Sequence, residues 1–305
     1  MVSGSGFLEE KQMRIRRCLL IAGMLFLPIL AGAQTTKLDP VLLKKANGGD
    51  ARSQFLVGQA YTSGKGVRQD DAQAAQWYQK ASDQGFAEAE FELALMLLAG
   101  RGVEQNDARG VLLLGRAAKQ GLARAQLALA GLYDRGEGVK QDYAQAAGLY
   151  RDAALQGVAE AQLNLGIMYE NGQGVPQDYS QAADLYRRAA EQGNATAQFN
   201  LGLLYDNGTG VDKDHAQASQ WYRKAAEQGV PRAQFNLGAM YAQGDGVPRN
   251  LVEAYFWLDL AASTWSGAHQ QEAAAARDKV AARLPLTDLM TAKQRAKDWL
   301  DGRRK

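Results

Sequence analysis

The sequence predicts an all-α protein in which six helix-turn-helix repeats of 36 residues stack into a solenoid, with further helices closing the two ends. Of the 305 residues, 33 are glycine and only 6 are proline. This imbalance is typical of a chain that needs positive φ angles at many positions, because proline cannot supply them. The motif Gly-x-Gly-Val also recurs with a constant step of 36 residues, beginning at Gly64, Gly100, Gly136, Gly172, Gly208 and Gly244. A step this regular predicts six copies of one unit between residues 49 and 264.

The first half of each repeat is predicted to form a helix, called helix A below. In the fourth repeat, apolar side chains at spacings of three and four residues, among them Ala161 and Leu165, form one stripe. The stripe predicts a helix over about 159–171. Gly172 follows its last residue, where a glycine in the left-handed conformation commonly ends a helix.

The second half of each repeat is predicted to form another helix, called helix B. Asp178 stands at its start in the fourth repeat, where a carboxylate can accept hydrogen bonds from the free amides of the first turn. The other repeats hold an aspartate or asparagine at the same position: Asp70, Asn106, Asp142, Asp214 and Asn250. Ala182, Tyr186 and Ala189 fall on one face of this helix, and Gly193 is placed as its C-cap.

Small and substituted residues predict how the helices pack. Gly166, Gly202 and Gly238 on the A helices are expected to let the backbones of neighbouring repeats approach closely. The second repeat departs most from the others, since Leu97 replaces the tyrosine of helix A and Gly110 replaces an alanine of helix B. We therefore expect looser packing in the second repeat.

The terminal repeats of a solenoid expose apolar faces that need covering. Residues 34–48 are predicted to form an N-terminal cap, with a short helix between Leu38 and Gly48. Residues 265–305 are predicted to form two C-terminal capping helices. The first runs from about His269 to Leu284, and the second reaches Leu300 with Thr287 as its N-cap.

The N-terminal segment is predicted to be a secretory signal peptide over residues 1–33. Arginines at 14, 16 and 17 precede an apolar run of 13 residues, 18–30, which is shorter than the roughly 20 residues that a membrane-spanning helix needs. The run ends in Ala31-Gly32-Ala33, a pattern that signal peptidases cleave, so we expect the mature chain to begin at Gln34 in the periplasm or outside the cell. A retained membrane anchor is the alternative. The start at Met1 or at Met13 stays open.

Charge and cysteine content exclude several classes of function. Lysine and arginine number 35 against 33 acidic residues, and beyond residue 33 the two counts are equal at 31 each, which gives no basic face for nucleic acid. Cys18, the only cysteine, lies in the predicted signal peptide. The mature chain is thus expected to lack disulfides, thiol nucleophiles and thiolate metal sites. His215 and His269 stand at no spacing that suggests a catalytic triad. We predict no enzymatic activity, no cofactor and no metal.

The repeat motif resembles that of the Sel-one-like repeat family, longer relatives of the tetratricopeptide repeat. In the fourth repeat the pattern is Ala161-x-x-x-Leu-Gly-x-x-Tyr169, then Gly172-x-Gly-Val-x-x-Asp178, then a helix B ending in Ala-Ala-x-x-Gly193. The resemblance implies a right-handed α-solenoid that binds other proteins. It also implies a role as an adaptor in polysaccharide export, a periplasmic regulator of sensor kinases or a host-interaction factor, and the sequence does not choose among these.

The same resemblance raises two alternatives. Some cysteine-rich relatives are assigned β-lactam binding or hydrolysis, so a hydrolase acting on β-lactams or peptidoglycan is the first. Those relatives use a disulfide in each repeat, which the mature chain cannot form. The second alternative is direct binding of muropeptides or glycans, for which aromatic side chains in a groove are expected.

One series of asparagines is a candidate partner-binding site. Asn164, Asn200 and Asn236 share one position of helix A, where the first three repeats hold Leu56, Glu92 and Ala128. In tetratricopeptide-like folds the A helices line the concave groove, and side-chain amides there can both donate to and accept from an extended peptide. The resemblance thus implies a protein or extended peptide as partner. The alternative interpretation is that these asparagines hydrogen-bond their own backbone.

Overall fold

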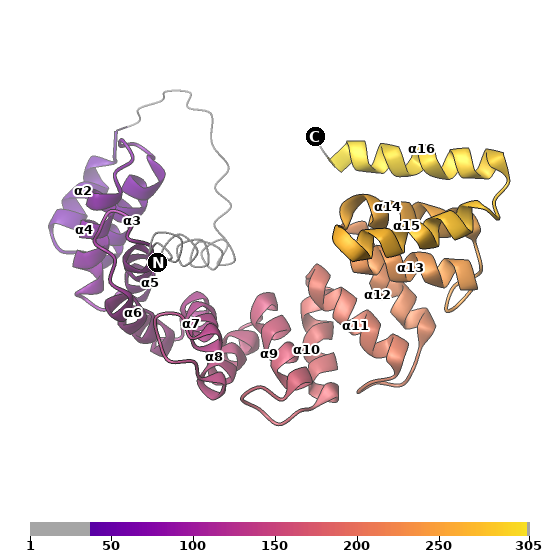
Figure 1. Ribbon diagram of the computed structural model, residues 1–305. Helices are drawn as coiled ribbons and strands as arrows, with labels where there is room; N and C mark the ends of the chain where they lie inside the picture. Colours follow the sequence, from indigo (N-terminus) through magenta and orange to yellow (C-terminus); the bar gives the residue numbers. More distant parts are fainter. Residues whose placement is uncertain (1–36, 304–305) are drawn as a thin grey trace, which may run out of the picture. The chain divides into compact units, whose positions relative to one another are not determined.

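The computed structural model describes residues 37–303, and this part of the chain forms fifteen helices and no strand (Figure 1). The prediction of an all-α fold with six repeated helix pairs is confirmed. The A helices are α3 (Ala51–Ser63), α5 (Ala87–Ala99), α7 (Ala123–Arg135), α9 (Ala159–Asn171), α11 (Ala195–Asn207) and α13 (Pro231–Gln243). The B helices are α4 (Asp71–Ser82), α6 (Asp107–Lys119), α8 (Tyr143–Leu155), α10 (Tyr179–Glu191), α12 (His215–Glu227) and α14 (Leu251–Thr264). The predicted signal peptide, residues 1–33, lies outside the described residues.

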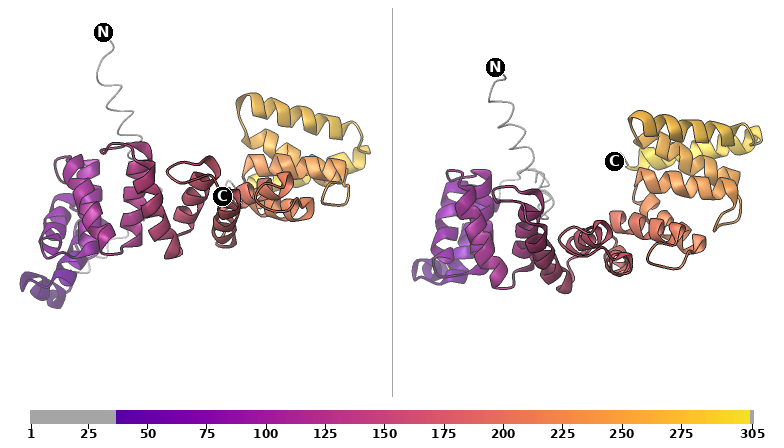
Figure 2. Two further views of the ribbon diagram at one scale, coloured as in Figure 1. Left: turned by 90° about the horizontal axis from the view of Figure 1, so that it is seen from below. Right: turned by 60° about the horizontal axis from the view of Figure 1, so that its bottom comes forward.

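The described helices divide into two compact units, with the boundary between Val158 and Ala159. The first unit holds the helices up to α8, and the second holds α9 and those that follow. Within each unit, every A helix packs against the B helix of its own repeat, and that B helix packs against the next A helix (Figure 2). Each repeat thus buries its apolar faces against its neighbours in sequence, as expected of a solenoid.

The two glycines of the Gly-x-Gly-Val motif have different tasks. The first ends helix A in the left-handed conformation, as at Gly208, which has φ 70° and donates to the Leu204 carbonyl at 2.9 Å. The second also has a positive φ, 72° at Gly210, and allows a close approach. A Cβ on Gly210 would lie 2.4 Å from the carbonyl carbon of Tyr179, at the start of the preceding B helix. The motif therefore both ends one helix and joins consecutive repeats.

The predicted N-caps of the B helices are confirmed. In five repeats the Asp or Asn side chain accepts from the backbone N–H three residues later at 2.9–3.0 Å, and Asn250 does so at 3.1 Å. The C-terminal end of helix B differs by one residue from the expectation. Helix α10 ends at Glu191 with Gln192 as its C-cap, and Gly193, with φ 90°, is the next residue. The left-handed turn follows the capping residue here, which is where the chain needs glycine.

The glycines of the A helices make room within a repeat rather than between repeats, so that expectation was wrong. A Cβ on Gly166 would lie 2.7 Å from the ring of Tyr186, and one on Gly202 would lie 2.7 Å from the ring of Tyr222. Each tyrosine belongs to the B helix of the same repeat as its glycine. Glycine therefore lets a large B-helix side chain lie against the A-helix backbone.

The leucines that replace aromatic residues in the second repeat are buried, and the looser packing expected there is confined to a hollow beside Leu97. Leu97, Leu113 and Leu114 are 3%, 4% and 1% exposed. Gly110 admits Leu98 of α5, because a Cβ there would lie 2.7 Å from the Leu98 Cγ. Leu113 and Leu114 thus lie buried where other repeats hold aromatic rings, whereas Leu97 leaves space beside it.

Helices α2 (Pro40–Asn47), α15 (Gly267–Ala281) and α16 (Leu286–Arg303) flank the repeats. Helix α16 packs against α14, where Arg295 forms an ion pair with Glu253. Its start corrects one prediction. The Pro285 carbonyl accepts from the Leu289 N–H at 3.0 Å, so the helix begins directly after the proline and Thr287 lies inside its first turn.

A second polar series, which sequence reasoning missed, ties the ends of the helices together. A buried glutamine near the start of helix A bonds in two directions. The Gln198 amide donates to the Ala190 carbonyl of the preceding helix at 3.0 Å, and its oxygen accepts from Gln228 of its own repeat at 2.8 Å. The same position holds Gln54, Gln126, Gln162 and Gln234. We call this arrangement the glutamine clasp; its signal in the sequence is the same step of 36 residues.

The second repeat builds the clasp from different groups. Glu90 replaces the glutamine and is completely buried, and its Oε2 accepts from Gln120 at 2.8 Å. A carboxylate cannot donate to the preceding carbonyl. Arg116 supplies that bond instead, pairing with Glu90 at 2.7 Å and donating to the Ser82 carbonyl at 3.5 Å. Burial raises the pKa of Glu90 in spite of the arginine.

Replacing Gly202 by alanine should destabilise the protein, because the added methyl would overlap the Tyr222 ring. We expect the free energy of unfolding in urea to fall by about 1–2 kcal/mol. The third repeat combines buried Ala130 with buried Tyr150 at the corresponding positions, so the neighbouring backbone can adjust and keep the loss moderate. The matched control is Gly148→Ala in α8, where nothing lies within 4 Å of the added Cβ and a gain of about 0.5–1 kcal/mol is expected. Equal losses in both variants would show that steric overlap is not the cause.

Replacing Glu90 by glutamine should make thermal stability less dependent on pH. Because the pKa of Glu90 is raised in the folded state, its ionisation disfavours folding, and this contribution grows as pH rises above the ordinary value of 4.5. We therefore expect the melting temperature of Glu90→Gln, relative to wild type, to increase between pH 4.5 and 7. The opposite trend would mean that the Arg116 pair outweighs the burial of the charge.

Candidate partner-binding surface

The three candidate asparagines lie on one accessible stripe of the second unit. Asn164, Asn200 and Asn236 occupy the same half-buried position of α9, α11 and α13. On each helix the residues four before, three after and seven after are also accessible. The stripe, called the amide stripe below, comprises Glu160, Asn164, Ile167, Asn171, Thr196, Asn200, Leu203, Asn207, Arg232, Asn236, Ala239 and Gln243.

Two of the asparagines are held in place by tyrosines of the preceding repeat. The side-chain amide of Asn200 hydrogen-bonds the hydroxyl of Tyr186, and that of Asn236 hydrogen-bonds the hydroxyl of Tyr222. Both tyrosines are completely buried in B helices. The asparagine position thus connects consecutive repeats, a contact that sequence reasoning did not foresee.

Each of these tyrosines also donates to a carboxylate on the A helix of its own repeat. The Tyr186 hydroxyl donates to Glu170, and the Tyr222 hydroxyl donates to Asp206 Oδ2 at 3.2 Å. Burial raises the pKa of both tyrosines far above the usual value of 10, and the neighbouring carboxylates raise it further. The hydroxyls therefore remain protonated donors at any physiological pH. The sequence signal for these carboxylates was again the step of 36 residues.

The first unit contains the same arrangement with other partners. Tyr78 bonds the Thr62 hydroxyl at 3.1 Å, and burial raises the pKa of Tyr78 to about 12. At the asparagine position, α5 carries Glu92, which is only 6% exposed and whose pKa is raised by burial. Arg124 of the next repeat lies 3.8 Å from this carboxylate. The polar row is therefore neutral in one part of the chain and charged in another.

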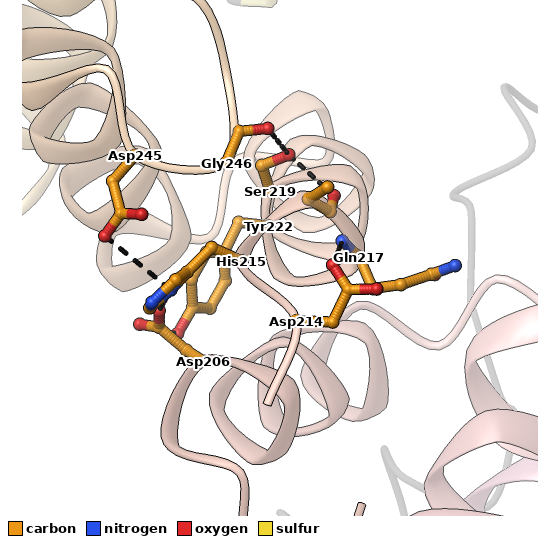
Figure 3. Close-up of polar contacts among 9 residues, drawn as sticks. Asp206, Asp214, His215, Gln217, Ser219, Tyr222, Asp245 and Gly246 are labelled. Carbon is orange, nitrogen blue, oxygen red and sulfur yellow. Dashed lines mark hydrogen bonds and ion pairs between the residues drawn. The ribbon is translucent and has the colours of Figure 1, made fainter. Parts of the chain in front are cut away.

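His215 extends the polar cluster around Asp206 (Figure 3). Its Nδ1 lies 2.7 Å from Asp206 Oδ1 and 3.6 Å from Asp245 Oδ2, which belongs to the loop of the following repeat. Ser219 lies in the same helix, but its hydroxyl donates to the backbone carbonyls of Ala216 and Gly246, at 2.8 and 3.5 Å. The histidine, aspartate and serine consequently do not form a nucleophilic triad, which requires the hydroxyl to hydrogen-bond the imidazole.

Residues 37–303 contain neither a cluster of metal-ligating side chains nor a membrane-spanning helix. In that range no three His, Cys, Asp or Glu side chains are placed to hold a metal ion. No helix in the same range is long and apolar enough to cross a membrane.

The repeats match a known family. Sel1 repeats are recognised at residues 51–86, 87–122, 123–158, 159–194, 195–230 and 231–263. Each begins at the first residue of an A helix. Among curated proteins, no match is found.

Several solved structures are similar to this chain, and the first of them is also a Sel1 repeat protein. A Sel1 repeat protein from Oxalobacter formigenes is 33% identical over 70% of this chain and 85% of its own, with a TM-score of 0.60. A protective antigen of uropathogenic Escherichia coli with an SLR fold is 24% identical over 96% of this chain and 94% of its own, with a TM-score of 0.32. An immunity protein of Pseudomonas aeruginosa is 20% identical over 70% and 81%, with a TM-score of 0.38.

Replacing Tyr222 by phenylalanine should lower the free energy of unfolding by about 1–3 kcal/mol, because both Asp206 and Asn236 would lose a partner inside the fold. Tyr78→Phe is the matched control, and a smaller loss of about 0.5–1.5 kcal/mol is expected there. Its partner Thr62 keeps a second hydrogen bond, to the Gly58 carbonyl at 3.0 Å. Urea denaturation of the two variants measures the difference. A larger loss for Tyr78→Phe would contradict the role assigned to the carboxylate.

Proposed function

The chain belongs to the Sel1 repeat family, whose members are generally protein-interaction scaffolds, and on that premise we propose that it is an exported, non-enzymatic adaptor. Its partner is a protein, bound through an extended segment along the amide stripe. Export rests on the predicted signal peptide and places the complex in the periplasm or outside the cell.

The hydrogen-bond donors and acceptors that the asparagines have left unused support the amide stripe as the partner site. A side-chain amide offers two donor hydrogens and one acceptor oxygen. At Asn200 and Asn236 one hydrogen is used by the tyrosine hydroxyl of the preceding repeat. One donor and the oxygen remain at each, which is the pair needed to accept from and donate to one peptide unit of an extended chain.

The spacing of the stripe suits the same partner. Corresponding positions of successive helix pairs repeat at roughly 10 Å. Three residues of an extended chain also span about 10 Å, so each asparagine would meet an equivalent peptide unit of the partner. Ile167, Leu203 and Ala239 lie half-buried beside the asparagines and offer apolar contact between those bonds.

The hydrogen bonds from Tyr186 and Tyr222 to the asparagines support a role of the amide stripe in binding a partner, beyond a role in stabilising the fold. Fixing a side chain before the partner arrives removes an entropy loss that binding would otherwise include. Tyr186 and Tyr222 hold Asn200 and Asn236 in this way from a completely buried position. This anchoring is the observation on which the proposal mainly depends.

Hydrolysis of β-lactams or peptidoglycan is the alternative function. Sel1 repeat solenoids are typically non-catalytic. The polar cluster around His215 directs its serine to backbone carbonyls and its imidazole to carboxylates, which does not favour nucleophilic chemistry. Muropeptide binding is a further alternative, and no contact of the amide stripe favours it.

Site-specific photo-crosslinking tests the location of the partner. A photoreactive side chain at Leu203, on the stripe, should capture the partner from the envelope fraction. The same group at exposed Gln220, on α12 of the same unit, should not. For the captured partner, replacing Asn164, Asn200 and Asn236 together by alanine should weaken binding by about tenfold to a thousandfold. The range follows from about 0.5–1.5 kcal/mol for each lost hydrogen bond.

The control separates binding from stability. A double variant, Tyr186→Phe with Tyr222→Phe, removes the anchoring hydrogen bonds but keeps all three amides. The asparagine variant should bind much more weakly than this double variant even where the two melt at similar temperatures. Equal binding by the asparagine variant and wild type would reject the amide stripe as the partner site.

A further inference from the structure

A hollow of about 680 Å³ lies in the first unit, between α4, α5 and the start of α6. It is lined by Leu93 and Leu97 of α5, Gln79 of α4 and Arg109 of α6. The loop from Gly102 to Asn106 also contributes to its lining. The volume is in the range of about 300–1,000 Å³ that is usual for pockets that bind small ligands or single side chains.

The repeats of the second unit have side chains of their own at this place. Leu97 corresponds to Tyr205 and Tyr241, so a tyrosine would stand at its position if the second repeat followed the others. Gln79 corresponds in the same way to Arg187 and Arg223. These arginines bond the tyrosines: Arg187 donates to the Tyr205 hydroxyl at 3.4 Å, and Arg223 donates to the Tyr241 hydroxyl.

The junction of the first and second repeats, between α4 and α5, therefore lacks both members of the arginine–tyrosine pair that joins α10 to α11 and α12 to α13. Leucine is shorter than tyrosine by most of a phenol ring, and glutamine is shorter than arginine. The hollow lies where those two side chains would extend. The residues around the hollow are therefore equivalent to those that surround a tyrosine in the other repeats.

The groups around the hollow suit an aromatic ring. Arg109 is exposed, donates to Gln79 Oε1, and forms no ion pair with any described carboxylate. A guanidinium group is attracted to the face of an aromatic ring. Between the last two repeats a guanidinium does approach the ring, but from the position of Gln79: the Arg223 guanidinium carbon lies 5.5 Å from the centre of the Tyr241 ring. In the hollow the guanidinium is supplied by Arg109 of the following B helix instead. The Gln79 amide donates to Asp83 and accepts from Arg109, which leaves one N–H for a phenol hydroxyl.

We propose that this hollow binds an aromatic side chain of a partner protein, tyrosine in particular, which takes the place that Tyr205 and Tyr241 occupy in their own repeats. The ring lies between Leu97 and Arg109, and the hydroxyl faces Gln79. The site is separate from the amide stripe, since all its residues belong to the first unit, and it does not require that stripe to bind anything.

Nuclear magnetic resonance with N-acetyltyrosine amide as the probe tests the site on the full mature chain. The probe should produce saturable shifts of the backbone amides of Leu93, Leu97 and Arg109. Leu97→Tyr, which gives the second repeat the side chain of the other repeats, should weaken this binding at least tenfold without lowering the melting temperature. N-acetylleucine amide should bind at least fivefold more weakly than the tyrosine probe, because it lacks the ring.

A second variant keeps the test decisive if Leu97→Tyr does not fold. Arg109→Gln places at this position the residue that Gln145, Gln181 and Gln217 supply in other repeats, so the fold should tolerate it. It should weaken binding of the tyrosine probe about threefold to tenfold. The proposal is wrong if the probe causes no saturable shifts near Leu97, if both variants bind it like wild type, or if N-acetylleucine amide binds equally well.

Discussion

The left-handed backbone at the first glycine of each Gly-x-Gly-Val motif is the constraint on which the rest of the structure depends. At Gly64, Gly100, Gly136, Gly208 and Gly244 it ends helix A, with φ between 63° and 81°. The loop that follows brings the second glycine against the first turn of the preceding B helix, so closely at Gly102, Gly210 and Gly246 that a Cβ would overlap backbone atoms. The same short segment therefore ends helix A and packs one repeat against the one before it. A side chain there would strain the turn and separate two repeats at once.

Inside the stack, polar side chains join the helices in addition to the apolar core. The glutamine clasp supplies donors to carbonyls near the ends of B helices, and the buried tyrosines connect an acid of their own repeat to an amide of the next. Buried polar groups destabilise a fold unless their partners are present, so a change at one member requires a change at another. Glu90 illustrates this: the carboxylate that replaces a glutamine is accompanied by Arg116, which makes the bond that the glutamine would have made.

Function in such a chain depends on the places where the repeats differ. The common positions are used for capping and packing and are alike in most repeats, so they distinguish no partner. The asparagine position carries an amide in the second unit but holds Glu92 in the second repeat. The tyrosine position of helix A holds the shorter Leu97 in the second repeat. These departures create one surface with free amide capacity and one hollow lined by Arg109, which hydrogen-bonds Gln79 and has no ion pair with a described carboxylate. Both proposals follow from comparing a repeat with its own copies in the same chain.

The sequence by itself determined the fold class, the number of repeats, the extent of helices such as α9 and the capping residues of the B helices. These depend on local rules: helical periodicity, positive φ at glycine and side-chain capping within three residues. Tertiary structure alone decided that Gly202 faces Tyr222 of its own repeat, that a hollow lies beside Leu97, and that Asn236 reaches Tyr222 of the repeat before it. Those contacts join positions 14 to 20 residues apart. Spacing along the chain cannot specify them, because the direction and reach of each side chain depend on how two helices pack.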